Sequence, residues 1–333
     1  MRARILIALL ALAGLPATVR AQEKPVLSVY TYASFTGKYG PGKLVKEAFE
    51  KDCACTLSFT AVDDGASMLS RLKLEGVTAK ADVILGVDNA LMHDLSATGL
   101  IAPHGLTLPA LDLPIAWTSA DFVPFDWGYF AFVYDSAKLA NPPASLAELA
   151  RRRDVKIIIQ DPRTSTPGLG LLTWMHAAFG PQAPEMWRQL KPNIVTVTKG
   201  WSEAYGLFLK GEADMVLSYT TSPAYHAGVE KKLNFKAASF AEGHLMQIEV
   251  AGILRTSKQP ALARRFLEFM LTPAFQSLIP ETNWMYPARA AEGGLPASFS
   301  GVAKPGKTLS LDPAEISAGR RRWIDEWLLA LAL

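Results

Sequence analysis

The chain has 333 residues, half of them hydrophobic, so it is long enough for two domains of ordinary size and too apolar to be intrinsically disordered. The formal net charge is +3, but three of the 34 basic residues lie among the first 21 residues, which contain no acidic residue. The rest of the chain carries equal numbers of basic and acidic residues. This balance removes the electrostatic argument for a nucleic-acid or anionic-membrane partner.

The first 21 residues have the pattern of a secretory signal peptide. Arg2 and Arg4 precede an apolar run over residues 5–15, and small residues then lead to Val19-Arg20-Ala21. The alternative, an uncleaved membrane anchor, is disfavoured because a membrane-spanning helix needs about 20 apolar residues. We therefore predict that residues 1–21 are removed and that the mature protein lies outside the cytoplasm.

Strands and helices alternate over the first hundred residues. We predict apolar strands at residues 26–32, 56–62 and 81–86. Apolar side chains at helical spacing follow the strands, which is typical of a parallel, doubly wound sheet. Ligands bind beyond the carboxyl ends of the strands in such sheets, so we expect the loops at Tyr32, Asp64 and Asp88 to share one functional edge.

A long aromatic segment at residues 122–134 interrupts this regularity. We interpret it as the crossing from a first lobe to a second, although its composition also allows an ordinary core strand. The alternation then resumes with strands at residues 155–160, 194–198 and 213–219. The sequence therefore predicts two α/β lobes joined by a hinge. The predicted boundaries are residues 25–124 and 247–286 for the first lobe, and residues 125–246 and 287–333 for the second.

Cysteine and histidine usage gives no indication of a metal site. Cys53 and Cys55 are the two cysteines of the chain, and an oxidising compartment would allow them to pair, although so short a loop is strained. Whether they are bonded therefore stays open. The five histidines are scattered without a pair at helical spacing. We predict no metal and no cofactor.

Two hydroxyl-rich turns follow strands and precede a proline at a helix start. The first contains Ser165 and Thr166, and the second runs through Tyr219, Thr220, Thr221 and Ser222. Hydroxyls, free backbone N–H groups and the helix dipole together favour an anion such as phosphate. A plain helix N-cap explains one such turn on its own. Because two turns in one lobe could face the same anionic group, we favour an anion site.

Several aromatic residues are predicted to lie on loops rather than in periodic core positions: Tyr32, Tyr39, Trp201, Tyr225 and Trp284. Aromatic faces bind flat rings and cations with about 0.5–2 kcal/mol each, although any single one is also explained by packing. Asp64, directly before Gly65, offers a carboxylate to a cationic group or caps the helix that follows. These residues predict a ligand with a flat cationic or amino-bearing ring at one end and an alcohol or phosphate at the other.

Specific motifs run through the chain from about Lys24 to the C-terminus. The longest is TVTKGWSEAYGLFLKGEADMVLSYTTSPAYH, and the others are QDPRTSTPGLGLL, KPVLSVYTYASF, DDGASMLSRLKLEG, ADVILGVDN, FVPFDWGYFAFVYD and NWMYP. Together they closely resemble the periplasmic thiamine-binding proteins of bacterial ABC importers. The resemblance implies a type II periplasmic binding protein fold, in which two doubly wound lobes are joined by a hinge and enclose a ligand cleft.

The resemblance also implies a function. The protein would bind thiamine, thiamine monophosphate or thiamine diphosphate in the periplasm by hinge closure. It would then deliver the ligand to an inner-membrane ABC permease driven by a cytoplasmic ATPase. We expect a monomer that is not an enzyme, with no cofactor and no nucleic-acid partner.

The motifs carry the family's site residues onto this chain. Ser165, Thr166 and residues 219–222 would meet the hydroxyethyl or phosphate end of the ligand. The residues expected around the rings are Asp64, Gly65, Tyr32, Trp201, Tyr225 and Trp284, with Asp64 offsetting the thiazolium charge. Two positions depart from the family pattern: Ala33 stands where an acidic residue is usual, and Tyr39 lies near the position of a tryptophan.

Two other functions, a thiaminase and a ferric-binding protein, fit the sequence less well. A thiaminase of the first type resembles the fold and needs a cysteine nucleophile in the cleft, but Cys53 and Cys55 are predicted at the opposite strand end. The Gly-x-Ser-x-Gly nucleophile motif is absent as well. A ferric site would use paired tyrosines with carboxylate or histidine help, whereas Tyr219 and Tyr225 are not adjacent. We therefore favour thiamine binding.

Overall fold

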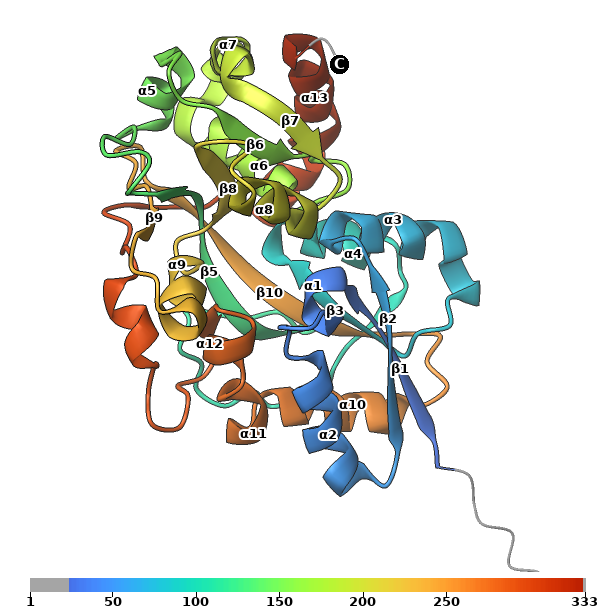
Figure 1. Ribbon diagram of the computed structural model, residues 1–333. Helices are drawn as coiled ribbons and strands as arrows, with labels where there is room; N and C mark the ends of the chain where they lie inside the picture. The colour runs from blue at the N-terminus through green and yellow to red at the C-terminus, as the bar shows by residue number, and fades with distance from the viewer. Residues whose placement is uncertain (1–23, 332–333) are drawn as a thin grey trace, which may run out of the picture.

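The computed structural model describes residues 24–331, and these form two α/β lobes, one above the other in Figure 1. The predicted signal peptide lies outside the described residues. Within residues 24–331, none of the helices combines the length and the apolar character that crossing a bilayer requires.

Three parallel strands form the centre of the first lobe, the lower one in Figure 1. They are β1 (Val26–Tyr32), β2 (Thr56–Val62) and β3 (Val83–Asp88), in the order β2-β1-β3. The helices around them are α1 (Ala33–Thr36), α2 (Gly42–Cys53), α3 (Gly65–Glu75), α4 (Met92–Ala97), α10 (Pro260–Met270), α11 (Pro273–Gln276) and α12 (Ile279–Thr282). Because the strands are parallel, their carboxyl ends meet at one edge, and this edge faces the second lobe (Figure 1).

Two long antiparallel strands connect the lobes (Figure 1). They are β5 (Phe122–Asp135) and β10 (His244–Leu254). In the first lobe β10 pairs with β3, and β5 pairs with β10 as far as Tyr129. From Phe130 onward β5 pairs with β8 of the second lobe. The aromatic segment that interrupts the sequence pattern therefore contributes to both sheets.

The second lobe repeats the parallel arrangement. Its strands are β6 (Ile157–Gln160), β7 (Ile194–Thr198) and β8 (Met215–Tyr219), in the order β5-β8-β6-β7. The helices of this part are α5 (Leu146–Arg151), α6 (Thr166–Phe179), α7 (Ala183–Leu190), α8 (Trp201–Leu209) and α9 (Pro223–Tyr225). One cluster of buried apolar side chains extends through both lobes and includes both connecting strands.

Helix α6 illustrates how the sequence determines its own boundaries. The hydroxyl of Ser165 accepts a hydrogen bond from the backbone N–H of Gly168, 3.5 Å away, and Pro167 occupies the first turn, where it removes no helical hydrogen bond. Gly180 ends the helix with a positive φ of 51°. Because α6 packs between α7 and strands β8 and β10, its apolar residues surround the helix instead of forming one stripe.

The C-terminal helix α13 (Pro313–Leu331) contacts both lobes. It packs on α7 of the second lobe and on α4 of the first. The guanidinium of Arg320 lies 3.0 Å from the carboxylate of Asp94 in α4, and the hydroxyl of Ser317 donates to the same side chain. The lobe assignment of residues 287–333 therefore stays a prediction.

Cys53 and Cys55 form a disulfide at the end of α2, which answers the question left open by the sequence. Ala54 between them has a positive φ of 52°, which lets the chain turn tightly before β2 begins. The bond lies at the amino end of β2, and neither cysteine lines the cavity between the lobes. Since the chain has only these two cysteines, the disulfide leaves no free thiol.

Candidate functional site

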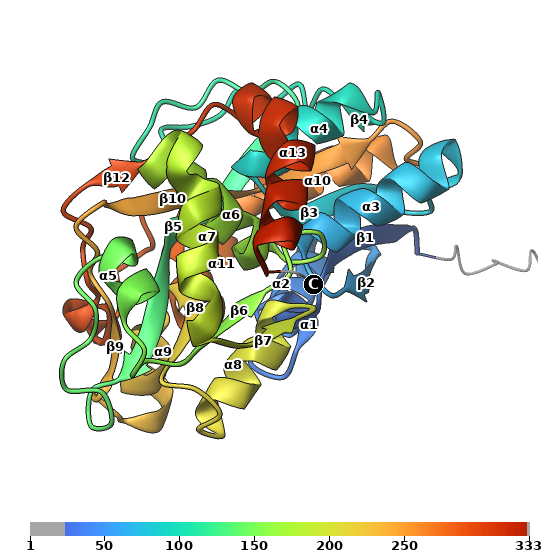
Figure 2. The same cartoon turned by 90° about the horizontal axis from the view of Figure 1, so that it is seen from above.

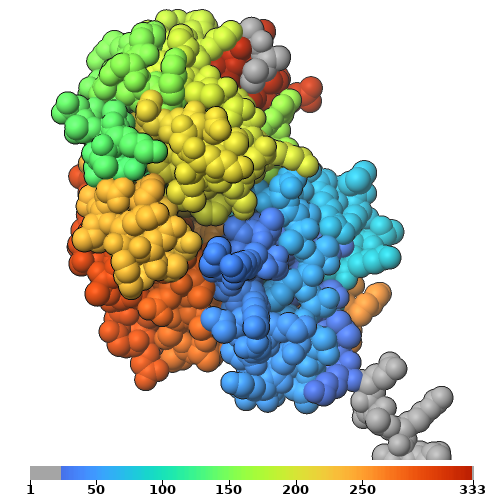
Figure 3. Space-filling view, in the orientation of Figure 1, coloured from blue at the N-terminus to red at the C-terminus, as the bar shows by residue number. Residues whose placement is uncertain are grey.

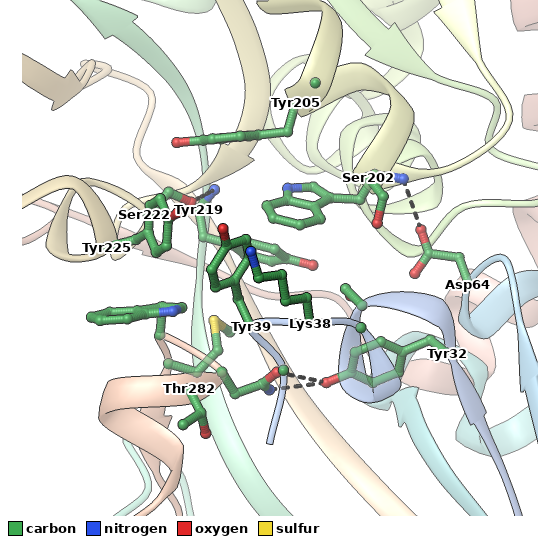
Figure 4. A pocket seen from close by; sticks show the side chains of 18 of the residues that line it. Tyr32, Lys38, Tyr39, Asp64, Ser202, Tyr205, Tyr219, Ser222, Tyr225 and Thr282 are labelled. Carbon is green, nitrogen blue, oxygen red and sulfur yellow. Dashed lines mark hydrogen bonds between the residues drawn. The ribbon is translucent and has the colours of Figure 1, made fainter. Parts of the chain in front are cut away.

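A cavity of about 350 Å³ lies between the two lobes. In Figure 3 the surface is hollowed where the blue N-terminal segment meets the yellow segment of the second lobe. Seven of the twelve residues predicted for the site line the cavity: Tyr32, Asp64, Trp201, Tyr219, Ser222, Tyr225 and Trp284. The cavity therefore draws on strand ends and helix starts from both halves of the molecule, as Figure 4 shows.

Aromatic rings form one wall of the cavity. Trp201 begins α8 and stacks on Tyr205, with the ring centroids 5.0 Å apart. The indole N–H of Trp201 donates to the hydroxyl of Ser218 at 2.8 Å, which fixes the orientation of the ring. This anchoring leaves the indole with a defined face toward the cavity, suited to a flat ring.

A second aromatic group lies toward the outer end of the cavity. The rings of Trp284 and Tyr225 meet edge to face with their centroids 5.5 Å apart. Tyr39 reaches across from the first lobe, and its ring centroid lies 6.0 Å from that of Tyr225 (Figure 4). Trp284 has a positive φ of 57°, a conformation that is uncommon outside glycine and that concentrates at binding sites. The backbone is held there by a hydrogen bond from its N–H to the carbonyl of Ile279 at 3.0 Å.

Asp64 lies where the two lobes touch. It precedes α3 in the first lobe, yet its partners come from the second lobe. The hydroxyl of Ser165 donates to its carboxylate at 2.9 Å, and the backbone N–H of Trp201 donates to the same oxygen at 3.3 Å. Burial raises the pKa of Asp64 to about 6, although these hydrogen bonds act in the opposite direction.

Gly65 continues this contact between the lobes. Its backbone N–H donates to the hydroxyl of Thr166 at 3.1 Å. A Cβ atom on Gly65 would lie 2.6 Å from that hydroxyl oxygen, closer than side chains tolerate. We refer to Asp64, Gly65, Ser165 and Thr166, with the N–H of Trp201, as the seam.

The two hydroxyl-rich turns lie in different surroundings. Ser165 and Thr166 belong to the seam and are almost fully buried, with hydroxyls that bond to the first lobe. In the second turn Ser222 lines the cavity, and its hydroxyl lies 2.7 Å from that of Ser218. Ser165 also caps the N-terminus of α6, so helix capping is enough to explain the hydroxyl of the first turn. Whether either turn holds an anion stays a prediction.

Thr220 and Thr221 of the second turn are buried beneath the cavity wall. The hydroxyl of Thr221 points toward the sulfur of Met285 at 3.6 Å. The hydroxyl of Thr220 has no hydrogen-bond partner among residues 24–331. Neither threonine lines the cavity, so contact with a ligand would require a rearrangement of the turn.

Two buried acids, Asp126 in β5 and Glu249 in β10, were not predicted from the sequence. Their Cα atoms are paired across the two connecting strands, and Glu249 lines the cavity. Burial is the main reason that the pKa of Asp126 rises to about 7 and that of Glu249 well above its ordinary value. The available signal was a single acid inside each long apolar run, FVPFDWGYF and HLMQIEVAGIL.

The interior behind the cavity is therefore rich in carboxyl groups. Asp64, Asp88, Asp126 and Glu249 are all buried, and burial raises the pKa of Asp88 to about 7 as well. Among the described residues no three histidine, cysteine, aspartate or glutamate side chains gather in a way that could hold a metal ion. An organic cation with a flat ring suits carboxyl groups behind aromatic walls.

Comparison with known proteins finds relatives over nearly the whole chain. The thiamine-binding periplasmic protein of Escherichia coli (strain K12) is 57% identical over 310 residues, which are 93% of this chain and 94% of the relative. The thiamine-binding periplasmic protein of Haemophilus influenzae (strain ATCC 51907 / DSM 11121 / KW20 / Rd) is 43% identical over 315 residues, 93% of this chain and 94% of the relative.

Solved structures show the same fold. A structure described as a periplasmic thiamin binding protein superposes with a TM-score of 0.90 at 57% identity, over 92% of this chain and 96% of that chain. Iron-bound HitA from Pseudomonas aeruginosa superposes with a TM-score of 0.73 at 21% identity, over 91% and 99% of the two chains. The second likeness shows the fold alone.

The family model for bacterial extracellular solute-binding proteins matches residues 32–277. The match and the relatives confirm the two-lobed periplasmic binding protein fold predicted from the sequence. They also confirm the expectation of a binding protein in place of an enzyme. The chain belongs to the bacterial extracellular solute-binding protein family.

Proposed function

We propose that this protein captures thiamine in the periplasm and delivers it to an inner-membrane ABC permease. Proteins named for thiamine binding are 43–57% identical to it over more than nine tenths of the chain. The single observation that carries the proposal is the composition of the cavity, where aromatic faces lie opposite buried carboxyl groups. Thiamine combines a cationic thiazolium ring with a flat aminopyrimidine, and both parts suit such a cavity.

The rings would be bound by two kinds of side chain. Trp201, Tyr225 and Trp284 offer aromatic faces and edges, each worth about 0.5–2 kcal/mol toward a flat or cationic ring. Asp64 and Glu249 line the same cavity, and in their ionised forms they would supply negative charge to a bound cation. Because both carboxyl groups are shielded from water, their attraction for a cation is stronger than at a protein surface.

The phosphate end of a phosphorylated ligand would meet the hydroxyl turns. Ser222 and Tyr219 already line the cavity. Ser165 and Thr166 would have to exchange their seam partners, Asp64 and Gly65, for phosphate oxygens. Phosphorylated thiamine would therefore bind with a slightly wider seam than thiamine itself. Because hydroxyls that can meet a phosphate already line the cavity, the proposed ligand class includes the monophosphate and the diphosphate.

Delivery follows from the two-lobed construction. Hinge closure would trap the ligand, and opening against the permease, with ATP hydrolysed by its cytoplasmic ATPase, would release it. The seam contacts lie between the lobes and would be made and broken in that cycle. We propose that the protein acts as a monomer.

Titration calorimetry of the mature protein tests the proposal. We expect one site per chain for thiamine, with thiamine monophosphate and diphosphate as further ligands. Thiochrome, the neutral oxidation product in which a third ring joins the two rings of thiamine and the thiazolium charge is lost, serves as the control and should bind at least tenfold more weakly. Native mass spectrometry of protein purified without refolding should reveal retained ligand by its mass. No heat with thiamine, or saturable binding of Fe(III) instead, would overturn the proposal.

A further inference from the structure

Asp126 and Glu249 face each other on the two strands that connect the lobes. Their Cα atoms are paired in the ladder between β5 and β10, and the register shifts immediately after Glu249. Asp126 is fully buried and Glu249 is 6% exposed. Glu249 also lines the cavity. Together the two side chains form what we call the acid pair, which lies on the connecting strands beside the cavity.

The acid pair shares too few hydrogen-bond donors for two charges. The amide nitrogen of Asn283 lies 2.6 Å from Oδ2 of Asp126 and 3.3 Å from Oε2 of Glu249. The hydroxyl of Tyr32 donates to the same Oε2 at 2.9 Å. Oδ1 of Asp126 has no donor among residues 24–331. Asn283 and Tyr32 are too few hydrogen-bond donors to keep two adjacent buried carboxylates ionised. One of the two carboxyl groups therefore holds a proton, which can donate a hydrogen bond to the other.

The charged groups around the pair reinforce this conclusion. Burial raises the pKa of Glu249 most, and the charges of Asp126 and then of Asp64, at the start of α3, raise it further. Tyr32 from β1 donates to Glu249. Burial and, after it, the charge of Glu249 raise the pKa of Tyr219 from β8. Asp88 from β3 interacts with Asp64 and with Arg320, the cation of α13. Lys38 lines the cavity beside Tyr39, within 5.0 Å of that ring.

We infer that Asp126 and Glu249 share one proton in the empty protein, and that a cationic ligand entering the cavity expels it. The inference rests on the proposed function only in taking the ligand to be a cation. A positive ring beside Glu249 stabilises the pair with both carboxyl groups ionised. Without the ligand, one proton held on the pair removes the repulsion between two carboxylates.

The sign of the effect follows from linkage. The bound cation lowers the pKa of the pair below its value in the empty protein. At a pH between the two values, binding therefore releases protons, and the dissociation constant falls as the pH rises. The effect disappears below the lower value, where both states are protonated, and above the upper value, where both are ionised.

Calorimetric titration with thiamine in buffers of different ionisation enthalpy measures the released protons directly. At pH 7.5 we expect roughly half a proton or more per thiamine bound by the wild-type protein. Glu249→Gln and Asp126→Asn each replace one member of the pair by a neutral isostere and should release markedly fewer protons. Either variant suffices if the other fails to fold. Protons released by thiamine itself are the same for every variant, so differences in proton release between variants come from the protein.

Glu281→Gln is the matched control, because Glu281 is an exposed acid two residues before Asn283 that does not line the cavity. It should release as many protons as the wild type. Binding of thiamine without proton release would overturn the inference and leave the proposed function intact. Unchanged release in both Glu249→Gln and Asp126→Asn would overturn the assignment to the pair. Absence of thiamine binding would overturn the proposed function itself.

Discussion

The two hydroxyl-rich turns of the second lobe give nearly the same signal in the sequence and occupy different positions in the structure. The turn before α6 lies on the seam, where Ser165 and Thr166 bond to Asp64 and Gly65 of the first lobe. The turn after β8 presents Ser222 to the cavity. A cluster of hydroxyls at a helix start can thus bind the other half of a hinged protein as readily as it binds a ligand. The following predictions separate the two roles.

Asp64→Ala should have the largest effect, because Asp64 belongs to both the seam and the cavity. The change removes the acceptor of Ser165 and of the Trp201 N–H together with a negative charge near the ligand. We expect thiamine affinity to fall by about 3 kcal/mol, or roughly 100-fold, in a calorimetric titration. Asp63→Ala, the exposed neighbour that pairs with Lys199, is the control and should change affinity little. Equal effects at both positions would remove Asp64 from the site.

Trp201→Ala tests the cavity wall. The ring that stacks on Tyr205 is lost, and thiamine binding should weaken about tenfold or more through lost stacking. Trp201→Phe keeps an aromatic face and should retain most of the affinity, as measured by the same titration. An unchanged dissociation constant in the alanine variant would exclude Trp201 from ligand contact.

The double substitution Ser165→Ala with Thr166→Val tests whether the seam hydroxyls also read phosphate. If they do, thiamine monophosphate and diphosphate should lose roughly fivefold more affinity than thiamine, since hydrogen bonds to charged groups are the stronger ones. Ser222→Ala provides the parallel measurement for the turn that lines the cavity. An equal loss for all three ligands in the double variant would restrict Ser165 and Thr166 to the seam.

Asp126→Asn should give the smallest of these effects, a change in how the thermal stability of the ligand-free protein depends on pH. Because the pKa of Asp126 is raised to about 7 in the folded protein, the folded state holds a proton that the unfolded chain releases near pH 4. Wild-type stability should therefore fall as the pH rises from about 4 to 7. The variant should lose a few degrees less in melting temperature between pH 5 and pH 8, as followed by circular dichroism. Parallel falls in both proteins would contradict the raised pKa.

Local patterns in the sequence predicted the parallel strands of both lobes well, because each strand is a short apolar run between turn residues. The three loops at Tyr32, Asp64 and Asp88 also lie at one edge of the sheet, as predicted, because the carboxyl ends of parallel strands meet on the same side. The segment after Tyr32 was expected to be an irregular loop, whereas it begins with the short helix α1.

Long-range partners could not be predicted in the same way. Ser165 lies 101 residues from Asp64, and a hydroxyl at a helix start gives no sign of which lobe it will face. Asp126 and Glu249 are 123 residues apart in the sequence and meet only because β5 and β10 are paired. Strand β10 had not been predicted, so the sequence offered no means of bringing the two acids together.

Helix α13 has a consequence for how far the molecule can open. In Figure 2 it lies on the side of the molecule opposite α8 and α9. Its contact with α4, through Arg320 and Asp94, joins the two lobes away from the cavity, which neither residue lines. When the cavity widens, this contact must slide or part. Side chains that do not line the cavity would then help to set how far the lobes open, and we expect shortening of α13 to change the rate of ligand release more than ligand preference.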